Sequence, residues 1–141
     1  MRVKKRKFVR GLLGLLVVMS LSFCGCSITE DGGMKLRDLD FTLVSDERMP
    51  EELKVMIEEK KGEEFKFTYA DQEFLYLCIG YGEQSTGGYS IAVNELYLTD
   101  NAIYVDTNLL GPSAKEKTNP AVSYPYIVIK TDFLDKTVVF E

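Results

Sequence analysis

Apolar and polar positions alternate along most of the chain after residue 62, which predicts a protein built mainly from β-strands. Residues 64–69 have the sequence EFKFTY, with aromatic residues on one face of a strand and polar residues on the other. Residues 74–81, FLYLCIGY, are apolar on both faces, which predicts a strand in the centre of its sheet. Further strands are expected at 41–45, 124–130 and 137–141.

Asp100 and Asn101 predict a tight turn between two strands, because both residue types tolerate positive φ. In such a hairpin, the apolar residues of the two strands share one face, and a pair of tyrosines lies on the other face. The register pairs Leu98 with Ile103, Leu96 with Val105, and Tyr97 with Tyr104.

The same register has two problems that predict a β-bulge near Asn94 and Glu95. It places Glu95 against Asp106, and it leaves Ile91 and Val93 out of phase with the apolar face. One extra residue in this strand would remove both problems.

Residues 50–62, PEELKVMIEEKKG, predict the one helix of the chain. Proline and two glutamates suit its first turn, and two lysines and a glycine suit its end. Its apolar residues Leu53, Met56 and Ile57 form one narrow stripe, as in a helix packed on another element. One short helix and about seven mostly antiparallel strands predict an α+β, mainly β fold, with a small sandwich as an open alternative.

The first 25 residues have the pattern of an export signal. Six basic residues lie within residues 1–10, followed by an apolar stretch at 11–23 and the sequence CGCS. This stretch is shorter than the about 20 apolar residues that a membrane-spanning helix needs. An uncleaved N-terminal anchor helix is the alternative.

The segment SFCGCS resembles a bacterial lipobox, in which cleavage precedes a cysteine that carries diacylglycerol. Cys26 fits this role because Gly25 precedes it, whereas Phe23 is too bulky to precede a cut at Cys24. The resemblance implies a lipoprotein signal peptide at residues 1–25, with Cys26 as the lipidated first residue. We expect a flexible tether at 26–39 and a β-rich binding domain at 40–141, anchored at the extracytoplasmic face of the cell membrane.

Removal of this signal makes the chain strongly acidic. The remaining 116 residues hold 11 Lys+Arg against 22 Asp+Glu, a net charge of −11. A phosphate backbone would be repelled, so nucleic-acid binding is disfavoured. Cys78 is the one cysteine left unmodified, so we expect no internal disulfide, and its apolar neighbours predict a buried, inert thiol.

The residue types of the chain argue against catalysis. The sequence contains no histidine, which removes the usual neutral-pH base and the common nucleophile pairs. The acidic pairs, such as Glu58-Glu59, are sequence neighbours whose side chains diverge. The aspartates lack the spacing of a calcium loop. We therefore expect no enzyme activity, no cofactor and no metal.

Two loops carry the unusual chemistry. The segment GEQSTGGYS at 82–90 combines paired glycines with a tyrosine, and the long polar segment at 111–126 ends in Tyr-Pro-Tyr. Tyrosine suits binding surfaces because it offers a large, stiff contact area. The alternative, purely structural interpretation of the first segment is a tight hairpin whose tyrosine begins the next strand. The candidate partner-binding residues are Thr86, Gly87, Gly88, Tyr89, Tyr124, Pro125 and Tyr126.

Residues 53–140 resemble the domain at the C-terminus of PrcB-type protease-complex subunits. The resemblance is carried by a P-E-L helix before the sheet, by IGYGEQSTGGYSI at 79–91 and by YPY at 124–126. It implies a non-catalytic, extracytoplasmic protein that associates with and stabilises a protease. The two loops are also loosely similar to those of chagasin-type cysteine-protease inhibitors, without the Asn-Pro and Arg-Pro-Trp elements of that family.

The leading hypothesis is a lipid-anchored, non-enzymatic module that binds another exported protein, with a protease as the expected class of partner and with stabilisation and inhibition both open. The alternative is a binder or sensor of a small envelope ligand such as a glycan or lipid, in which the tyrosines stack on the ligand. A cavity of several hundred cubic ångströms lined by aromatic residues would favour that alternative.

Overall fold

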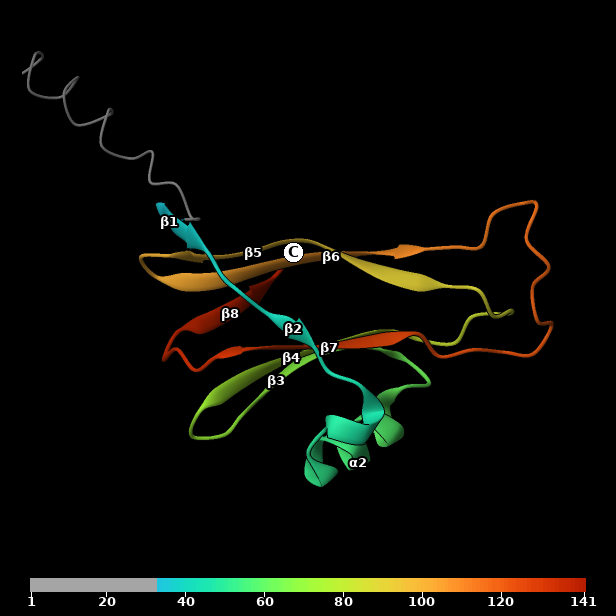
Figure 1. Ribbon diagram of the computed structural model, residues 1–141, viewed down its shortest axis with the longest axis horizontal. Coiled ribbons are helices and arrows are strands. Elements are labelled where there is room, and N and C mark those ends of the chain that lie inside the picture. The colour runs from blue at the N-terminus through green and yellow to red at the C-terminus, as the bar shows by residue number, and fades with distance from the viewer. Residues whose placement is uncertain (1–32) are drawn as a thin grey trace, which may run out of the picture. The chain divides into compact units, whose positions relative to one another are not determined.

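The structure is a computed structural model that describes residues 33–141. In this part of the chain, two four-stranded β-sheets pack face to face (Figure 1). The export signal, Cys26 and the tether residues before 33 lie outside the described residues. Sheet A has the strand order β1 (Lys35–Asp38), β5 (Ser90–Thr99), β6 (Ala102–Leu110) and β8 (Thr137–Phe140). Sheet B has the order β2 (Thr42–Leu43), β7 (Tyr126–Asp132), β4 (Phe74–Tyr81) and β3 (Glu64–Ala70).

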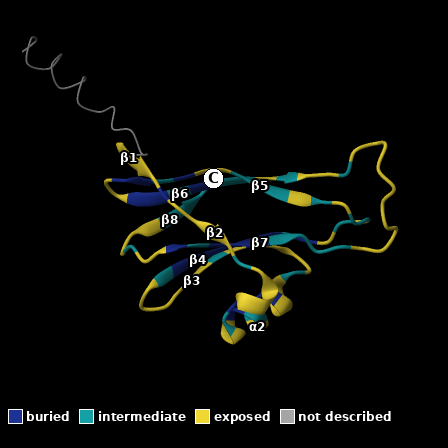
Figure 2. Ribbon diagram, viewed as in Figure 1, coloured by how far each residue is buried: buried dark blue, intermediate teal, exposed yellow. Residues whose placement is uncertain are grey.

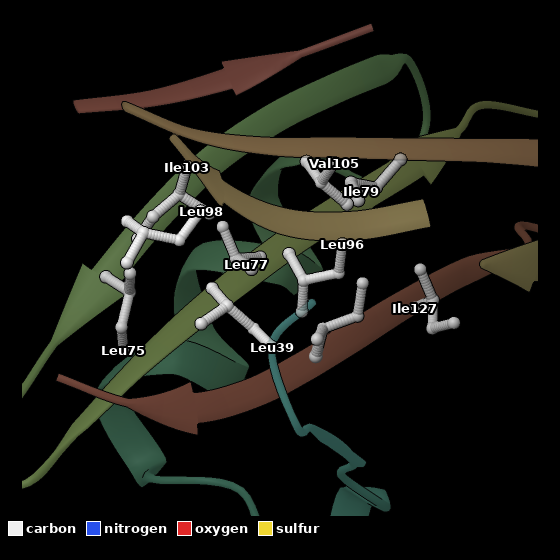
Figure 3. Close-up of a cluster of buried hydrophobic side chains, with 10 residues drawn as sticks. Leu39, Leu75, Leu77, Ile79, Leu96, Leu98, Ile103, Val105 and Ile127 are labelled. Carbon is white, nitrogen blue, oxygen red and sulfur yellow. The ribbon is translucent and has the colours of Figure 1, made fainter. Parts of the chain in front are cut away.

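The main hydrophobic core lies between the two sheets. Alternate residues of β4 and β7 from sheet B meet alternate residues of β5 and β6 from sheet A (Figure 3). Its buried members are Leu39, Leu75, Leu77, Ile79, Leu96, Leu98, Ile103, Val105, Ile127 and Ile129. Burial of these aliphatic side chains, each worth about 1.5–3 kcal/mol, is the main source of the sandwich's stability.

A second core lies on the opposite face of sheet B, beneath the 3₁₀ turn η2 (Asp46–Arg48) and the helix α2 (Glu51–Lys60). Leu53 and Ile57 of the helix are almost fully buried there, while the outer face of the helix is exposed (Figure 2). Cys78 of β4 belongs to this second core. β4 therefore contacts one core on each face, as its unbroken apolar sequence predicted.

The fold class predicted from the sequence is confirmed, with one short helix and a mainly β, mostly antiparallel architecture. The described residues hold eight strands, and two of them precede the helix. One pair, β6 with β8, is parallel. β1 lies inside the range assigned to a tether, yet it pairs with β5, and Leu39 is buried in the main core. The sandwich thus begins before residue 40.

The β5–β6 hairpin has the predicted register, including the pair formed by Tyr97 and Tyr104, whose rings stack with centroids 5.3 Å apart. Its turn differs from the expectation, because no non-glycine residue within 33–141 has positive φ. The buried hydroxyl of Thr99 instead accepts from the backbone N–H of Ala102 at 3.0 Å. A side chain thus closes the turn.

The predicted bulge is present between Val93 and Glu95 and returns Ile91 and Val93 to the main core. The expectation that it would separate Glu95 from Asp106 was wrong, since these two residues remain paired. Asn94, the extra residue, donates from Nδ2 to the Asp106 carboxylate at 3.0 Å. The bulge thus gives the Asp106 carboxylate a hydrogen-bond donor, the Asn94 amide, next to the negatively charged Glu95.

Candidate binding site at the paired crossovers

The two candidate loops are two of the connections that cross between the sheets, and they lie at the same end of the sandwich (Figure 1). The first crossover, residues 82–89, leads from β4 of sheet B to β5 of sheet A. The second crossover, residues 111–125, leads back from β6 to β7. The first crossover leaves β4, and the second enters β7, the neighbour of β4 in sheet B. The second crossover leaves β6, and the first enters β5, the neighbour of β6 in sheet A. The topology therefore brings the two crossovers together.

Backbone hydrogen bonds join the two crossovers directly. Gln84 and Ser123 form an antiparallel bridge, in which the Gln84 N–H donates to Ser123 O at 2.8 Å and the reverse bond is 3.0 Å. Further along, the Gly87 N–H donates to Asn119 O at 3.0 Å. The Ser123 hydroxyl also donates to the carbonyl of Thr86 at 2.6 Å. The first and second crossovers therefore form one structural unit.

The paired glycines serve this contact in different ways. Gly88 has a φ of +89°, and a Cβ atom there would lie 3.0 Å from Cβ of Pro112 in the second crossover. Gly87 has no positive φ, and a Cβ there would lie 3.5 Å from Asn119, an ordinary contact. The requirement for glycine is therefore at Gly88, where the first crossover packs closely against the second.

Tyr89 is half-buried and packs over the backbone of Gly111, with its ring 3.4 Å from where a Cβ of that glycine would lie. This contact joins the start of β5 to the end of β6. Tyr89 is thus the last residue of the first crossover, directly before β5, and presents only part of its ring to solvent. The alternative interpretation as a tight hairpin was wrong, because the loop joins β4 of sheet B to β5 of sheet A.

Tyr124 and Tyr126 are two residues apart in an extended segment, and both contact the helix side of sheet B. The Tyr124 hydroxyl donates to Glu83 at 3.2 Å, and Lys61 Nζ lies 5.5 Å from the centre of its ring, a cation–π contact. The Tyr126 hydroxyl donates to Asp46 of η2 at 2.6 Å. The hydroxyls of Tyr124 and Tyr126 are therefore each held by a carboxylate.

Pro125 connects these tyrosines through a trans peptide bond, since the residues from 33 onward contain no cis peptide. Its carbonyl accepts from the Tyr81 N–H at 3.0 Å, which continues the pairing of β7 with β4 beyond the strand ends. Beneath the crossovers, Tyr81 Oη and Thr107 Oγ1 share a 2.7 Å hydrogen bond between the two sheets. The site thus rests on a hydrogen-bonded base.

The electrostatics of these groups follow from burial and nearby carboxylates. Burial, the hydrogen bond to Asp46 and the charge of Glu58 raise the pKa of the Tyr126 phenol. Burial alone raises the pKa of the Cys78 thiol to about 12, so this cysteine is a neutral core residue at physiological pH, as predicted. Within residues 33–141 no three acidic or cysteine side chains form a group that could hold a metal ion.

A cavity of about 280 Å³ opens beside Tyr126, between η2 and α2. Its lining residues are Asp46, Glu47, Met49, Lys54, Ile57, Glu58 and Tyr126. Tyr126 is its one aromatic residue, so the cavity does not meet the aromatic lining that would favour a glycan or lipid ligand.

Comparison with protein families connects this β-sandwich with a known domain. Residues 75–132 match the family model described as PrcB C-terminal, which confirms the resemblance seen in the sequence and relates the domain to protease complexes. The match contains β4 to β7 and both crossovers, and it begins after the helix. No curated protein and no solved structure matches the chain. The looser likeness to chagasin-type inhibitors stays a prediction.

Among residues 33–141, no helix has both the length and the apolar character needed to cross a membrane.

Sequence reasoning named the tyrosines and glycines but missed the residues that hold them. The missed partners are Asp46, Lys61, Glu83, Pro112, Asn119 and Ser123. Alternation in the β7 segment was the signal available for Tyr126, because Tyr126 and Val128 share one strand face and Ile127 and Ile129 share the other. This alternation alone predicts that Tyr126 faces away from the main core.

Proposed function

We propose that this chain is a lipid-anchored, non-catalytic module of the extracytoplasmic surface that binds another exported protein through the paired crossovers. A protease is the first partner to test, because the match to the PrcB C-terminal family relates the domain to protease complexes.

The observation that carries the proposal is the bridging of the two crossovers at one end of the sandwich, where Gln84 and Ser123 pair. Such a unit is held in position by the scaffold, so a partner meets a preorganised surface and less ordering entropy is lost on binding. The tips remain available, since residues 113–122 are all exposed. Val122 in the second crossover is 52% exposed and Leu110 at the end of β6 is 46% exposed, which gives this end of the sandwich apolar contact area.

The membrane anchor in this proposal is the lipidated Cys26 expected from the lipobox resemblance. Two or more acyl chains are enough for stable anchoring without a spanning helix. The charge of the part after residue 25, −11, would keep the domain away from an anionic lipid surface and leave the crossovers free for a protein.

The test is site-specific photo-crosslinking in cells that express the full chain. A photoreactive amino acid replaces Ala114 or Val122 in the second crossover, and in a matched control it replaces Glu73 in the β3–β4 turn at the opposite end of the sandwich. All three positions are exposed, so none disturbs a core. We expect one exported protein to be crosslinked from the two crossover positions and not from Glu73. Equal yields from both ends, or products only from Glu73, would show that the crossovers are not the binding surface.

A further inference from the structure

The cavity between η2 and α2 combines an apolar floor with an acidic rim. Met49 and Ile57 are 5% and 1% exposed and form the floor. Its volume of about 280 Å³ is just below the range of about 300–1,000 Å³ typical of small-molecule pockets. A cavity of this size suits a single long side chain better than a complete ligand.

The charges around the cavity are mainly negative. The carboxylates of Asp46, Glu47 and Glu58 line it, against the single ammonium of Lys54. Lys54 Nζ lies 3.3 Å from Glu51, so its charge is already partly compensated outside the cavity. Among the ion pairs of residues 33–141, none includes Glu47. Glu58 is paired with Lys61 at 2.9 Å, so the negative charge of the rim that no cation of the described residues pairs with is that of Asp46 and Glu47.

This cavity adjoins the second crossover. Tyr126 forms part of its wall, and Lys61 connects it to the loop, because Lys61 Nζ lies 2.9 Å from Glu58 and 5.5 Å from the centre of the Tyr124 ring. The cavity therefore lies beside the C-terminal end of the second crossover, next to the proposed binding surface. Apart from Tyr126, the lining residues lie outside the range matched by the family model.

We propose that this cavity binds an arginine or lysine side chain of the protein partner. The methylene groups of such a side chain would pack on Met49 and Ile57, and its cationic head would meet the carboxylates of the rim. The Tyr126 ring supplies an aromatic wall of the kind on which basic side chains pack. This inference rests on the proposed function for the source of the side chain, whereas the chemistry of the cavity can be tested without any partner.

The test uses the full chain, isotope-labelled in zwitterionic detergent micelles, and follows its amide signals by NMR during titration with N-acetyl-arginine amide. The same titration is repeated with N-acetyl-citrulline amide, which has nearly the same shape without the charge, and with N-acetyl-norleucine amide. We expect saturable shifts of the Glu47, Met49 and Tyr126 signals with the arginine probe at millimolar concentrations. The two neutral probes should shift them several-fold less.

Matched variants assign the effect to the cavity. Glu47→Gln removes a rim charge from an exposed position and should weaken the arginine probe about two- to five-fold, the range of exposed ion pairs. Glu116→Gln makes the same charge change in the second crossover and should leave the affinity unchanged. Added salt should weaken the wild-type interaction in the same direction.

Three results would overturn the inference: equal shifts with the citrulline probe, no shift at the cavity with arginine, or equal affinity in Glu47→Gln and wild type. The photo-crosslinking experiment gives an independent result. If the arginine probe binds and the crosslinks fail, the cavity keeps its assigned chemistry and the binding surface of the proposed function is wrong.

Discussion

Gly88 and Pro112 meet where the two crossovers pack together, and a methyl group on Gly88 would lie 3.0 Å from Cβ of Pro112. The φ of +89° at Gly88 makes the same position unfavourable for any residue with a side chain. One glycine thus allows the first crossover to approach the second closely enough for their backbones to pair.

Gly88→Ala should therefore destabilise the protein by about 1–3 kcal/mol, because a non-glycine residue is forced into the left-handed region. Gly87→Ala is the matched control, since that position has no positive φ and has ordinary space around it. Denaturant unfolding of the two variants measures the difference. Equal destabilisation by both substitutions would show that the contact with Pro112 is not the reason for the glycine.

Ser123→Ala should loosen the pairing of the crossovers, because it removes the 2.6 Å hydrogen bond to the Thr86 carbonyl. The expected loss is about 0.5–1.5 kcal/mol, as for an ordinary hydrogen bond. Hydrogen exchange should also accelerate at the amides of Gln84 and Gly87, which donate across the crossovers. Ser85→Ala, at an exposed position in the same loop, serves as the control. Unchanged exchange in Ser123→Ala would mean that the backbone bridge is sufficient by itself.

The parts of the fold that could be predicted are those governed by local pairing. The register of Tyr97 with Tyr104 follows from the two-residue turn and the alternation on either side of it, and the structure has that register. The double burial of β4 follows from its unbroken apolar sequence. In both places the periodicity of a short segment contains the whole signal.

The parts that could not be predicted depend on partners distant in sequence. β1 is a polar edge strand whose Leu36 is 57% exposed, so it lacks the inward-facing alternation that identifies a strand. The surroundings of Tyr126 could not be predicted, because its hydroxyl bonds Asp46, 80 residues earlier in the chain. No local pattern indicates that η2 packs beside β7.

Tyr126→Phe tests that distant contact. The substitution keeps the ring and removes the hydroxyl that donates to Asp46 at 2.6 Å. We expect a loss of about 1–2 kcal/mol, because the acceptor is a carboxylate but both groups are partly exposed to water. Hydrogen exchange should accelerate at Arg48, whose amide donates to the Ser45 carbonyl in η2. Tyr89→Phe removes the hydroxyl of the tyrosine in the first crossover and should leave both the stability and the exchange near those of the wild type. Equal effects of the two substitutions would contradict a specific role for the bond to Asp46.

Because of Cys78, the free energy of unfolding should decrease as the pH rises through the alkaline range. Burial raises the pKa of the thiol to about 12 from its ordinary value of 9.0. The unfolded chain therefore loses this proton at a lower pH than the folded chain does. The stability contributed by Cys78 is complete below about pH 9 and is lost progressively as the pH rises toward 12.

Cys78→Val isolates this effect, because it keeps an apolar side chain on β4 and removes the titrating group. The free energy of unfolding of wild type relative to Cys78→Val should be constant between about pH 6 and 8 and should fall by about 1–2 kcal/mol near pH 10.5. Tyrosine and lysine titrations are present in both proteins and cancel in the difference. A difference that stays constant up to pH 10.5 would mean that the thiol ionises at the same pH in the folded and unfolded chains. That result would contradict the burial of Cys78 beneath the helix.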